Sequence, residues 1–358
     1  MHRILVINPG STSTRIAVYE DEEERYGVLL EHPKEELDAL GRVRAQLPLR
    51  RQAIAEGLAG AGLLDVLYDA VVGRGGMLRP VASGTYAISP AMLADAADMR
   101  SREHAANLGS LIADEFSRRY GVPAYVVDPV SVDEFEPLSR VAGLPGIERR
   151  SLSHALNLKA AARRAAAALG RPYPALNLVV AHMGGGISVS AHRQGRMVDV
   201  NQALDGTGPF SPERAGGLPV GDVMRMAFAG QYAYAGMFAL VTRGGGLLAH
   251  LGTNDAREVE RRIGENDAHA RLIYEAMAFQ IAKEIGLMAT VLYGRVDAIV
   301  LTGGLAHSRM LTDWIRERVA WIAPLFLFPG ESEMLSLAQG ALRVLRGEEE
   351  AQEYAPDV

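Results

Sequence analysis

Residues 4–20, ILVINPGSTSTRIAVYE, and residues 178–194, LVVAHMGGGISVSAHRQ, carry one pattern twice. Each stretch has an aliphatic strand, a polar residue, a loop of small residues and a second strand that returns. The polar residues Asn8 and His182 occupy the same place in the two copies, and nearly half of the 358-residue chain separates them. The repeat predicts an internal duplication of two similar α/β domains.

The segments between and after these copies alternate between short apolar strands and longer helical patterns. Strands are expected at about residues 70–72, 124–127 and 298–301, and helices at about residues 34–62, 90–120, 149–169, 255–293 and 333–345. We therefore place the first domain at residues 1–148, completed by the C-terminal segment 333–358. The second domain spans residues 149–332.

The composition is that of an ordinary globular protein and excludes several function classes. A hydrophobic fraction of 48% with 22% charged residues excludes global disorder. The absence of cysteine excludes disulfides, thiolate nucleophiles, zinc fingers and iron–sulfur clusters. A net charge of −6 without a dense basic stretch argues against nucleic acid as a partner. No window holds 18 uncharged apolar residues and the first residues do not resemble a secretory signal, so we expect no membrane association and a cytoplasmic location.

The common sequence motifs of nucleotide-binding proteins and hydrolases are absent from this sequence. None of the three lysines follows a glycine, which excludes a Walker A loop, and no Gly-x-Gly-x-x-Gly follows a strand. His-Glu-x-x-His and Gly-x-Ser-x-Gly are also absent. Three glycine- or serine-rich loops are left, at residues 8–13, 182–188 and 301–304, each directly after a strand. Because backbone N–H groups in such loops can surround an anion, three of them indicate a polyphosphate bound between the two domains.

The duplicated hairpins and Thr302-Gly303-Gly304 resemble the phosphate-1, phosphate-2 and adenosine loops of the acetate and sugar kinase, chaperone ATPase and actin superfamily. More narrowly, the whole chain is similar to the acetate kinase family. The matching stretches, in family order, are NPGSTSTR, VVGRGG, VVDPV, RRSLSHALNL, HMGGGISV, FSPERAGGLPVGD, LTGGLAH and PGESEMLSLAQGAL. Within that family, NPGSTSTR and HMGGGIS look more like the butyrate kinase branch than like acetate kinase itself.

This resemblance implies an α/β fold of two duplicated ribonuclease-H-like, or actin-like ATPase, domains flanking an interdomain cleft. It also implies reversible, Mg²⁺-assisted phosphoryl transfer from ATP to the carboxylate of butanoate, which yields butanoyl phosphate and ADP. The preferred acid stays open, with isobutyrate, propionate and acetate as alternatives, and a partner-gated ATPase of the actin or chaperone type is a less favoured hypothesis. The expected partners are the small carboxylate and further copies of the chain, in a dimer or higher homo-oligomer.

The resemblance also assigns roles to individual residues, position by position. The catalytic candidates are Asp128, His154, Arg74 and Arg214. The nucleotide-binding candidates are Asn8, Ser11, Ser13, Arg15, His182, Gly184, Gly185, Gly186, Asp255, Arg257, Gly303 and Gly304. The magnesium candidates are Asn8, Asp128, Glu333 and the less well aligned Glu331. Taken alone, many of these would be interpreted as turn or helix-capping residues.

Two arginines stand out because the sequence departs from the family pattern near them. Acetate kinases carry an arginine shortly before a Val-His-Gly-Gly segment, but here Ala70 or Val71 stands near that place and Arg74 lies where the histidine would be. They also carry an arginine just before Ser-Gly-Asp, whereas here Arg214 lies further upstream of Asp222. We therefore expect Arg74 and Arg214 to bind the carboxylate and the transferring phosphoryl group. A surface salt bridge is the alternative for both.

Overall fold

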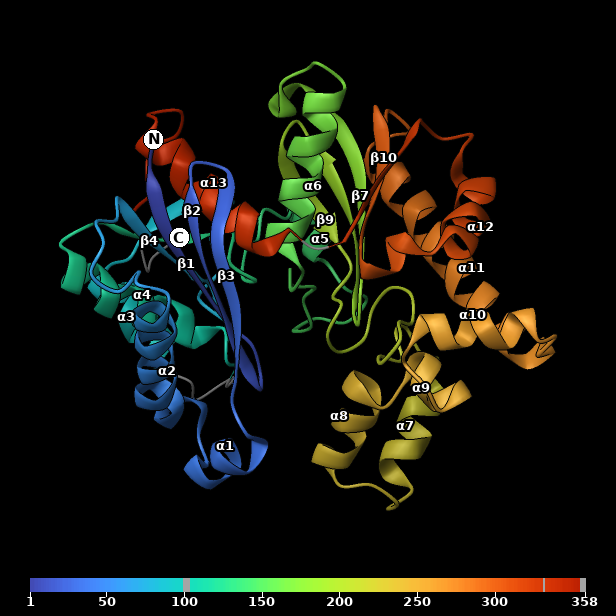
Figure 1. Cartoon of the computed structure of the whole chain (residues 1–358). Coiled ribbons are helices and arrows are strands. Elements are labelled where there is room, and N and C mark those ends of the chain that lie inside the picture. The colour runs from blue at the N-terminus through green and yellow to red at the C-terminus, as the bar shows by residue number, and fades with distance from the viewer. Residues whose placement is uncertain (99–103, 331, 355–358) are drawn as a thin grey trace. The chain divides into compact units, whose positions relative to one another are not determined.

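Figure 1 shows the computed structural model, which describes residues 1–98, 104–330 and 332–354. The chain divides into two compact units. Unit 1 comprises Met1–Val132 and Ser332–Val358, and unit 2 comprises Asp133–Glu331. Each unit is a mixed sheet with helices packed against it, so each has its own hydrophobic core.

The division between the units falls earlier in the chain than the predicted boundary at 148/149. Glu134 explains the difference, because its Oε2 accepts hydrogen bonds from the Lys159 ammonium at 2.6 Å and from the Met197 N–H at 2.6 Å. Lys159 is fully buried, so this ion pair is part of the interior. These bonds tie residues 133–148 to a helix and a strand of unit 2.

The sheet of unit 1 has six strands in the order β3-β2-β1-β4-β6-β5. They are β1 (Arg3–Pro9), β2 (Ser13–Glu20), β3 (Glu23–Glu31), β4 (Ala70–Arg74), β5 (Thr85–Ala87) and β6 (Ala124–Val127). β1, β2 and β3 form an antiparallel meander, β4 and β6 run parallel to β1, and β5 pairs antiparallel with β6. The strands predicted at 70–72 and 124–127 are confirmed as β4 and β6.

Helices cover the sheet of unit 1. They are α1 (Lys34–Leu40), η1 (Val43–Gln46), α2 (Leu47–Gly60), α3 (Pro90–Ala97), α4 (Asn107–Tyr120) and α13 (Glu333–Leu345). α2 and α4 share a core with Leu5, Ile7 and Val71, whereas α13 packs on β1 and β4 after returning from the far end of the chain (Figure 1). The helix predicted over 34–62 is interrupted at Gly41, which ends α1 with a positive φ of 72°.

The sheet of unit 2 has five strands in the order β11-β10-β7-β8-β9. They are β7 (Asn177–Met183), β8 (Ile187–Arg193), β9 (Arg196–Val200), β10 (Ala298–Gly303) and β11 (Leu325–Pro329). β7, β8 and β9 form an antiparallel meander, and β10 runs parallel to both β7 and β11. The strand predicted at 298–301 is confirmed as the start of β10.

The helices of unit 2 include one long core helix and a group of shorter ones. They are α5 (Pro137–Arg140), α6 (Ala155–Ala168), η2 (Tyr173–Ala175), α7 (Val220–Phe228), α8 (Tyr234–Arg243), α9 (Gly246–Leu251), α10 (Ala256–Gly264), α11 (Ala268–Val291), η3 (Gly304–His307) and α12 (Arg309–Val319). α6 packs on β7 and β10, and α11 packs on β7 and β8 around Met277 and Ile281. Among the described residues, no helix is long and apolar enough to cross a bilayer.

The two sheets repeat one strand order, which confirms the predicted duplication. In each unit a three-stranded meander is followed by two parallel strands that extend the sheet from its first strand. β1 and β7 both have seven residues, and each ends one residue after the paired positions Asn8 and His182. Because the carboxyl ends of parallel strands meet at one edge of a sheet, the loops after these strands lie together within each unit.

The end of β4 is held by a backbone-to-backbone contact with α4. A Cβ on Gly73 would lie 2.2 Å from the Gly109 carbonyl oxygen, and a Cβ on Gly109 would lie 2.2 Å from the Arg74 carbonyl oxygen. Both positions therefore require glycine, because a packed interior has no room for a further carbon atom. The contact holds Arg74 in place at the strand end.

Gly109→Ala is expected to lower the free energy of unfolding by about 1–3 kcal/mol, because the added methyl group forces α4 away from β4. Gly60→Ala is the matched control in the same unit. Nothing lies within 4 Å of a Cβ at Gly60, so this change is expected to be neutral or slightly stabilising. Urea unfolding of both variants measures the difference, and equal stabilities would contradict the close approach.

Candidate active site

Three of the predicted site residues lie at the ends of neighbouring strands in unit 1. Asn8 is the penultimate residue of β1, Arg74 ends β4, and Asp128 directly follows β6. β4 lies between β1 and β6, and its Arg74 pairs with Val127 of β6. The register therefore brings Asn8, Arg74 and Asp128 to one edge of the sheet.

Glu333, the first residue of α13, joins two of these residues. Its Oε2 accepts a hydrogen bond from the Asn8 amide at 2.8 Å, and its Oε1 lies 3.5 Å from Nη2 of Arg74. Arg74 is only 6% exposed, so the alternative prediction of a salt bridge at the surface is wrong for this arginine. Its Nη1 has no hydrogen-bond partner among the described residues. An unpaired buried donor costs about 1–3 kcal/mol, and a bound anion would remove that cost.

Asp128 is fully buried and has a positive φ of 38°. Its Oδ1 accepts hydrogen bonds from the Ser83 hydroxyl at 2.6 Å and from the Gly84 N–H at 2.9 Å. The Asp128 N–H donates in turn to the Gly84 carbonyl at 3.0 Å. Aspartate is one of the few residues that tolerate a positive φ, so the chain can turn here. The turn at Ser83 and Gly84 thus holds the carboxylate in one orientation at the strand end.

The magnesium candidates do not form a closed metal cage. Within the described ranges, no three His, Asp or Glu side chains lie together as a ligand set. Both oxygens of Glu333 face Asn8 and Arg74, and Glu331 lies outside the described residues. Mg²⁺ in nucleotide sites needs only one or two protein carboxylates, because phosphates and water supply the other ligands. The single oriented carboxylate of Asp128 fits such a site.

The loop after β1 is held from the protein interior by Arg50, a residue that the sequence did not single out. Arg50 lies on α2 and is fully buried. Its guanidinium donates to the carbonyl oxygens of Ser11 and Ser13 at 2.9 and 2.8 Å, and to the Thr14 hydroxyl at 3.0 Å. Gln46 accepts from its Nε and Nη2 at 3.1 and 2.9 Å. Burial lowers the pKa of Arg50 to about 10, so the group is still charged at neutral pH.

This arrangement prepares the loop for an anion. In a trans peptide the N–H points away from the preceding carbonyl, so the Thr12 N–H points away from Arg50. Ser11 is exposed and Ser13 is half-buried, whereas Arg15 lies on β2 and pairs with Glu24 at 3.8 Å. The loop therefore offers the Thr12 N–H at its surface, whereas the Gly10 N–H is used within the loop, where it donates to the Ser13 carbonyl at 2.8 Å.

The equivalent loop of unit 2 consists of three glycines between β7 and β8. The Gly184 N–H donates to the Gly186 carbonyl at 3.0 Å. The Gly185 carbonyl accepts a hydrogen bond from the Ser211 hydroxyl at 2.6 Å. Ser211 is buried, so this loop too is held by a polar side chain from another segment.

Two histidines and an arginine gather at this loop. The rings of His154 and His182 have centroids 4.4 Å apart, and Nδ1 of His154 lies 2.9 Å from the Ser188 hydroxyl. A Cβ on Gly186 would lie 2.3 Å from Nη1 of Arg214 and 3.2 Å from Cε1 of His154. The structure thus brings four predicted residues together, and the missing side chain of Gly186 makes room for the guanidinium.

Arg214 is held by the turn in which it lies. Its Nη1 donates to the Ala203 carbonyl at 2.6 Å, and its backbone N–H donates to the Ser211 hydroxyl at 3.1 Å. Burial lowers the pKa of Arg214, but an arginine stays protonated at neutral pH. A fixed positive charge therefore lies beside two imidazoles and a glycine loop, which is a set of donors suited to a multiply charged anion.

Two further nucleotide candidates contact each other at the start of α10. Asp255 caps that helix by accepting the Arg257 N–H at 2.9 Å, and it also accepts the Arg257 Nη2 at 2.8 Å. The hydrogen bond from the Arg257 side chain is the main cause that lowers the pKa of Asp255 to about 2. The Arg257 side chain is 92% exposed. In the structure Asp255 caps α10 and binds Arg257. Binding of adenosine by these two residues stays a prediction.

Gly303 and Gly304 end the central parallel strand of unit 2. Gly303 has a φ of 92°, and a Cβ there would lie 2.4 Å from the Met183 carbonyl oxygen. Glycine is therefore required where the ends of β10 and β7 approach each other. Gly304 begins η3 and has open space around it, so the backbone is accessible at this point.

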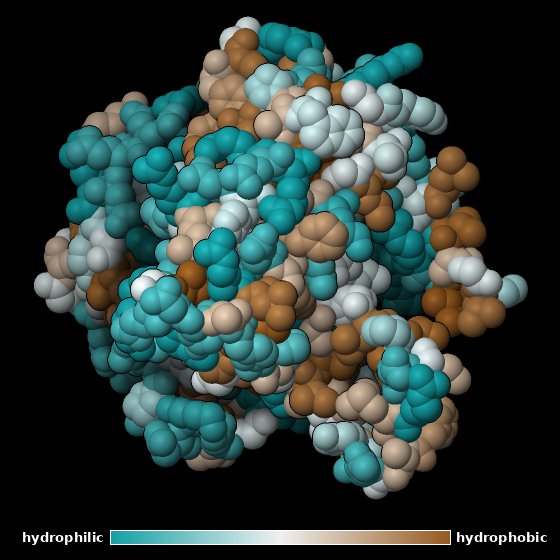
Figure 2. Space-filling model, turned by 90° about the vertical axis from the view of Figure 1, so that its right-hand side faces the viewer, coloured by the Kyte–Doolittle hydropathy of each residue, from teal (hydrophilic) through white to brown (hydrophobic). Residues whose placement is uncertain are grey.

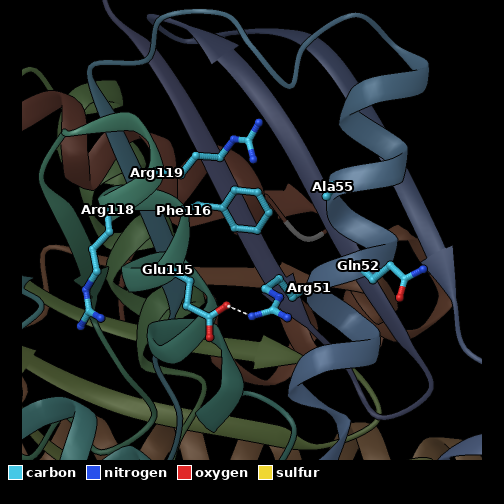
Figure 3. Close-up of a pocket in the computed structure, with 7 residues that line it drawn as sticks. All are labelled: Arg51, Gln52, Ala55, Glu115, Phe116, Arg118 and Arg119. Atoms are coloured by element: carbon cyan, nitrogen blue, oxygen red, sulfur yellow. Dashed lines mark hydrogen bonds and ion pairs between the residues drawn. The ribbon is translucent and has the colours of Figure 1, made fainter.

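A surface hollow of about 370 Å³ lies elsewhere in unit 1, between α2 and α4 (Figure 3). It is lined by Arg51, Gln52, Ala55, Glu115, Phe116, Arg118 and Arg119. Its three arginines pair with Glu115, Asp114 and Asp65 at 3.2, 2.6 and 2.8 Å. Because each positive charge is already neutralised, we assign no ligand to this hollow.

The duplicated strand order and the small-residue loops at the strand ends define a two-domain actin-like ATPase fold. Solved structures of acetate and propionate kinases share this fold. Acetate kinase from Porphyromonas gingivalis has a TM-score of 0.79 at 19% identity and covers 96% of this chain and 100% of its own. A propionate kinase from Francisella tularensis has a TM-score of 0.75 at 18% identity, with 95% and 99% covered. Acetate kinase from Entamoeba histolytica has a TM-score of 0.76 at 15% identity, with the same coverage.

The sequence model of the Acetokinase family matches residues 146–320, just under half of the chain. This stretch contains His154, His182, the three-glycine loop and Arg214. The chain thus carries an acetate kinase family domain. The predicted resemblance to this family is confirmed over these residues.

Arg50→Met is expected to lower the free energy of unfolding by about 2–4 kcal/mol, because several buried acceptors lose a charged donor. Arg51→Met, one residue along α2, is the matched control. Its side chain is 53% exposed and pairs with Glu115 at 3.2 Å, so its loss should cost less than about 1 kcal/mol. Urea unfolding measures both changes. If the two variants were equally stable, Arg50 would not hold the loop.

Proposed function

We propose that this protein is an acetokinase-family carboxylate kinase that transfers the γ-phosphoryl group of ATP to a short-chain fatty acid, with butanoate as the preferred acid. The cluster of His154, His182 and Arg214 at the three-glycine loop carries this proposal. A loop that only binds a nucleotide needs backbone N–H groups. The added imidazoles and guanidinium suit a reaction in which a second anion approaches the phosphates.

The choice of butanoate rests on the two phosphate loops. NPGSTSTR and HMGGGIS are similar to the butyrate kinase branch, whereas acetate kinases usually have a third serine in the first loop and an asparagine in the second. The solved neighbours named above act on acetate or propionate, which supports a short carboxylate as the acceptor. The partner-gated ATPase is less well supported, because ATP hydrolysis alone does not require the buried Arg74 donor.

The proposed reaction needs no general base, because the acid is ionised at neutral pH. One carboxylate oxygen forms a bond to the γ-phosphorus while the bond from this phosphorus to the bridging oxygen breaks. The products are the acyl phosphate and ADP, and no proton is transferred. The obstacle is the repulsion between two anions, so fixed positive charge and hydrogen-bond donors are the main catalytic requirement.

The residues of each unit then take distinct roles. Arg214 neutralises charge on the transferring group, and His154, oriented by Ser188 through Nδ1, donates a hydrogen bond to its equatorial oxygens. In unit 1, Arg74 offers its buried Nη1 to the carboxylate or the phosphates. Donors held in this way need no rearrangement during the reaction.

Mg²⁺ fits the donors at the edge of unit 1. The Nδ2 group of Asn8 donates to Glu333, which leaves its Oδ1 as an oxygen ligand. Asp128 would position the ion or its water from the next strand but one, with its carboxylate held by Ser83 and Gly84. When bound with ATP, the ion supplies neutralisation of the phosphate charge.

ATP turnover with straight-chain acids of two to six carbons tests the function. ADP is expected only when both an acid and Mg²⁺ are present, and trapping with hydroxylamine should detect the acyl phosphate. We expect kcat/KM to be highest for butanoate. Because one methylene group is worth about 1–3 kcal/mol in a pocket, propionate should be about tenfold less efficient.

The same assay separates the competing hypotheses. A maximum at acetate, propionate or isobutyrate would retain the reaction and contradict butanoate as the preferred acid. ADP formation at the same rate with and without any acid would contradict the kinase altogether and favour an ATPase. EDTA should abolish turnover if the metal assignment is correct.

Gly186→Ala is expected to lower kcat by about 10²-fold, because its methyl group displaces the Arg214 guanidinium. The atoms nearest to this Cβ all belong to side chains, so the backbone can stay in place and the melting temperature should change little. Gly185→Ala is the control, since the nearest atom to a Cβ there, Oε2 of Glu213, is 3.7 Å away. Equal kcat values for the two variants would remove Arg214 from the reaction.

A further inference from the structure

Residues 348–354 follow α13 and are the last described segment of the chain. The end of a chain usually frays unless contacts tie it to the domain. Apolar residues gather in patches on the face of the molecule that Figure 2 shows, but this segment buries its own, since Tyr354 is only 5% exposed and packs with Tyr86. The Tyr354 hydroxyl donates to Asp95 at 2.7 Å and accepts the Arg79 N–H at 3.0 Å. The chain end is therefore anchored in unit 1.

The segment pairs with the outermost strand of the unit 1 sheet, which is β5. The Gln352 N–H donates to the Thr85 carbonyl at 2.8 Å, and the Gln352 carbonyl accepts the Ala87 N–H at 3.0 Å. Gln352 thus forms a parallel bridge with Tyr86, the residue between these two. The Thr85 N–H donates in turn to Oε1 of Glu349 at 2.8 Å. An edge strand presents unpaired backbone groups, and here the chain end pairs with them.

The side chain of Gln352 lies against the turn that holds Asp128. Its Nε2 donates to the Ser83 carbonyl at 3.1 Å. A Cβ on Gly84 would lie 2.1 Å from the same nitrogen, so the amide occupies the space that a side chain at position 84 would need. Ser83 and Gly84 donate in turn to Oδ1 of Asp128 at 2.6 and 2.9 Å. The turn therefore connects the end of the chain to this buried carboxylate.

The turn depends on such a neighbour for its place. It consists of two small residues, and the hydroxyl of Ser83 is used on Asp128 itself. Gln352 restrains the turn through its side chain at Ser83 and through its backbone at Thr85, directly after Gly84. A group that acts on a metal ion or a phosphate must be held to within about 0.5 Å of its working geometry. The contacts of Gln352 supply a restraint of this kind.

We infer that Gln352 is a positioning residue for the proposed reaction, which holds the Ser83–Gly84 turn and, through that turn, the orientation of the Asp128 carboxylate. The inference rests on the proposed function, in which Asp128 positions Mg²⁺ or its water. Gln352 acts through Asp128 and needs no contact with ATP or the acid. Its loss should therefore weaken the reaction step more than the binding of the acid.

The C-terminal part of the chain then supports the candidate site of unit 1 at two places. α13 begins with Glu333, whose carboxylate contacts Asn8 and Arg74 at the ends of β1 and β4. The segment after α13 brings Gln352 to the turn that holds Asp128 at the end of β6. All three predicted residues at this sheet edge are thus held by residues 333–354, directly or through the turn.

Hydrogen exchange of the Gly84 N–H tests the positioning without any ligand, because its bond to Asp128 protects this amide. Gln352→Met keeps the length of the side chain and removes the donor, and it should speed the exchange about tenfold, as expected for one lost hydrogen bond. Glu353→Met, the same change at the exposed neighbour, should leave the rate unchanged. Gln352 is half-buried, so both variants should fold, which thermal melting checks. An unchanged rate in Gln352→Met would overturn the inference.

Turnover of the same variants shows whether this positioning matters for the reaction. Gln352→Met is expected to lower kcat about tenfold and to leave KM for butanoate within about twofold of the wild-type value. Tyr354→Phe is a second control, because it removes the two hydrogen bonds that anchor the chain end and leaves Gln352 intact. It should lower the melting temperature and leave kcat unchanged. Equal losses of kcat in the two variants would mean a merely structural role and would overturn the inference.

A double variant locates the effect at Asp128 and keeps the two proposals apart. Asp128→Asn keeps the shape of the side chain and removes its charge. In that background Gln352→Met should lower kcat by less than about twofold, because two residues that act as a unit are not additive. Full additivity would overturn the inference. A wild-type protein without acid-dependent turnover would reject the proposed function, and Gly84 exchange that Gln352→Met leaves unchanged would still overturn the positioning.

Discussion

A loop of glycine and serine has little structure of its own, and in each unit buried polar side chains from other segments hold such a loop in place. Arg50 binds the carbonyl oxygens of Ser11 and Ser13 in unit 1. Ser211 binds the Gly185 carbonyl in unit 2, and Asn201 binds the Ile187 carbonyl where the next strand begins. Holding the loops through their carbonyl oxygens leaves backbone N–H groups to face an anion.

The same requirement explains how the two arginines of the candidate site differ. Arg74 is buried beside a carboxylate, Glu333, and its Nη1 has no hydrogen-bond partner within the part of the chain that the structure describes. At Arg214 a backbone carbonyl, that of Ala203, accepts a hydrogen bond from the guanidinium instead. Both charges are therefore immobile before any ligand binds, which is the condition for strong electrostatic stabilisation of a developing charge.

Ser211 connects the glycine loop, Arg214 and the helix α9. Its hydroxyl donates to the Gly185 carbonyl and accepts the Arg214 N–H, while its own carbonyl accepts the Leu247 N–H of α9 at 3.2 Å. Gly246 has a φ of 61°, and a Cβ there would lie 1.7 Å from the Ser211 carbonyl oxygen. The start of α9 is thus packed against the segment that holds the glycine loop of unit 2.

The sequence by itself determined the duplication, the central strands and the loops at their ends, because strand periodicity and small-residue loops are local patterns. It also placed Asn8, Arg74 and Asp128 correctly at strand ends. Helical spacing puts Arg50 on the same face as Ile54 and Leu58, but only the tertiary structure decided that a charged side chain is buried there and which carbonyl oxygens it binds. It alone decided which distant segments meet.

The contact between Asn8 and Glu333 joins residues 325 positions apart, and the contact between Gly186 and Arg214 depends on the absence of a side chain. No local pattern contains these distances, because they follow from how strands and helices pack once the chain has closed on itself. The sequence therefore determined the elements of the site, and packing decided which of its charges are buried, which are paired and which face a ligand.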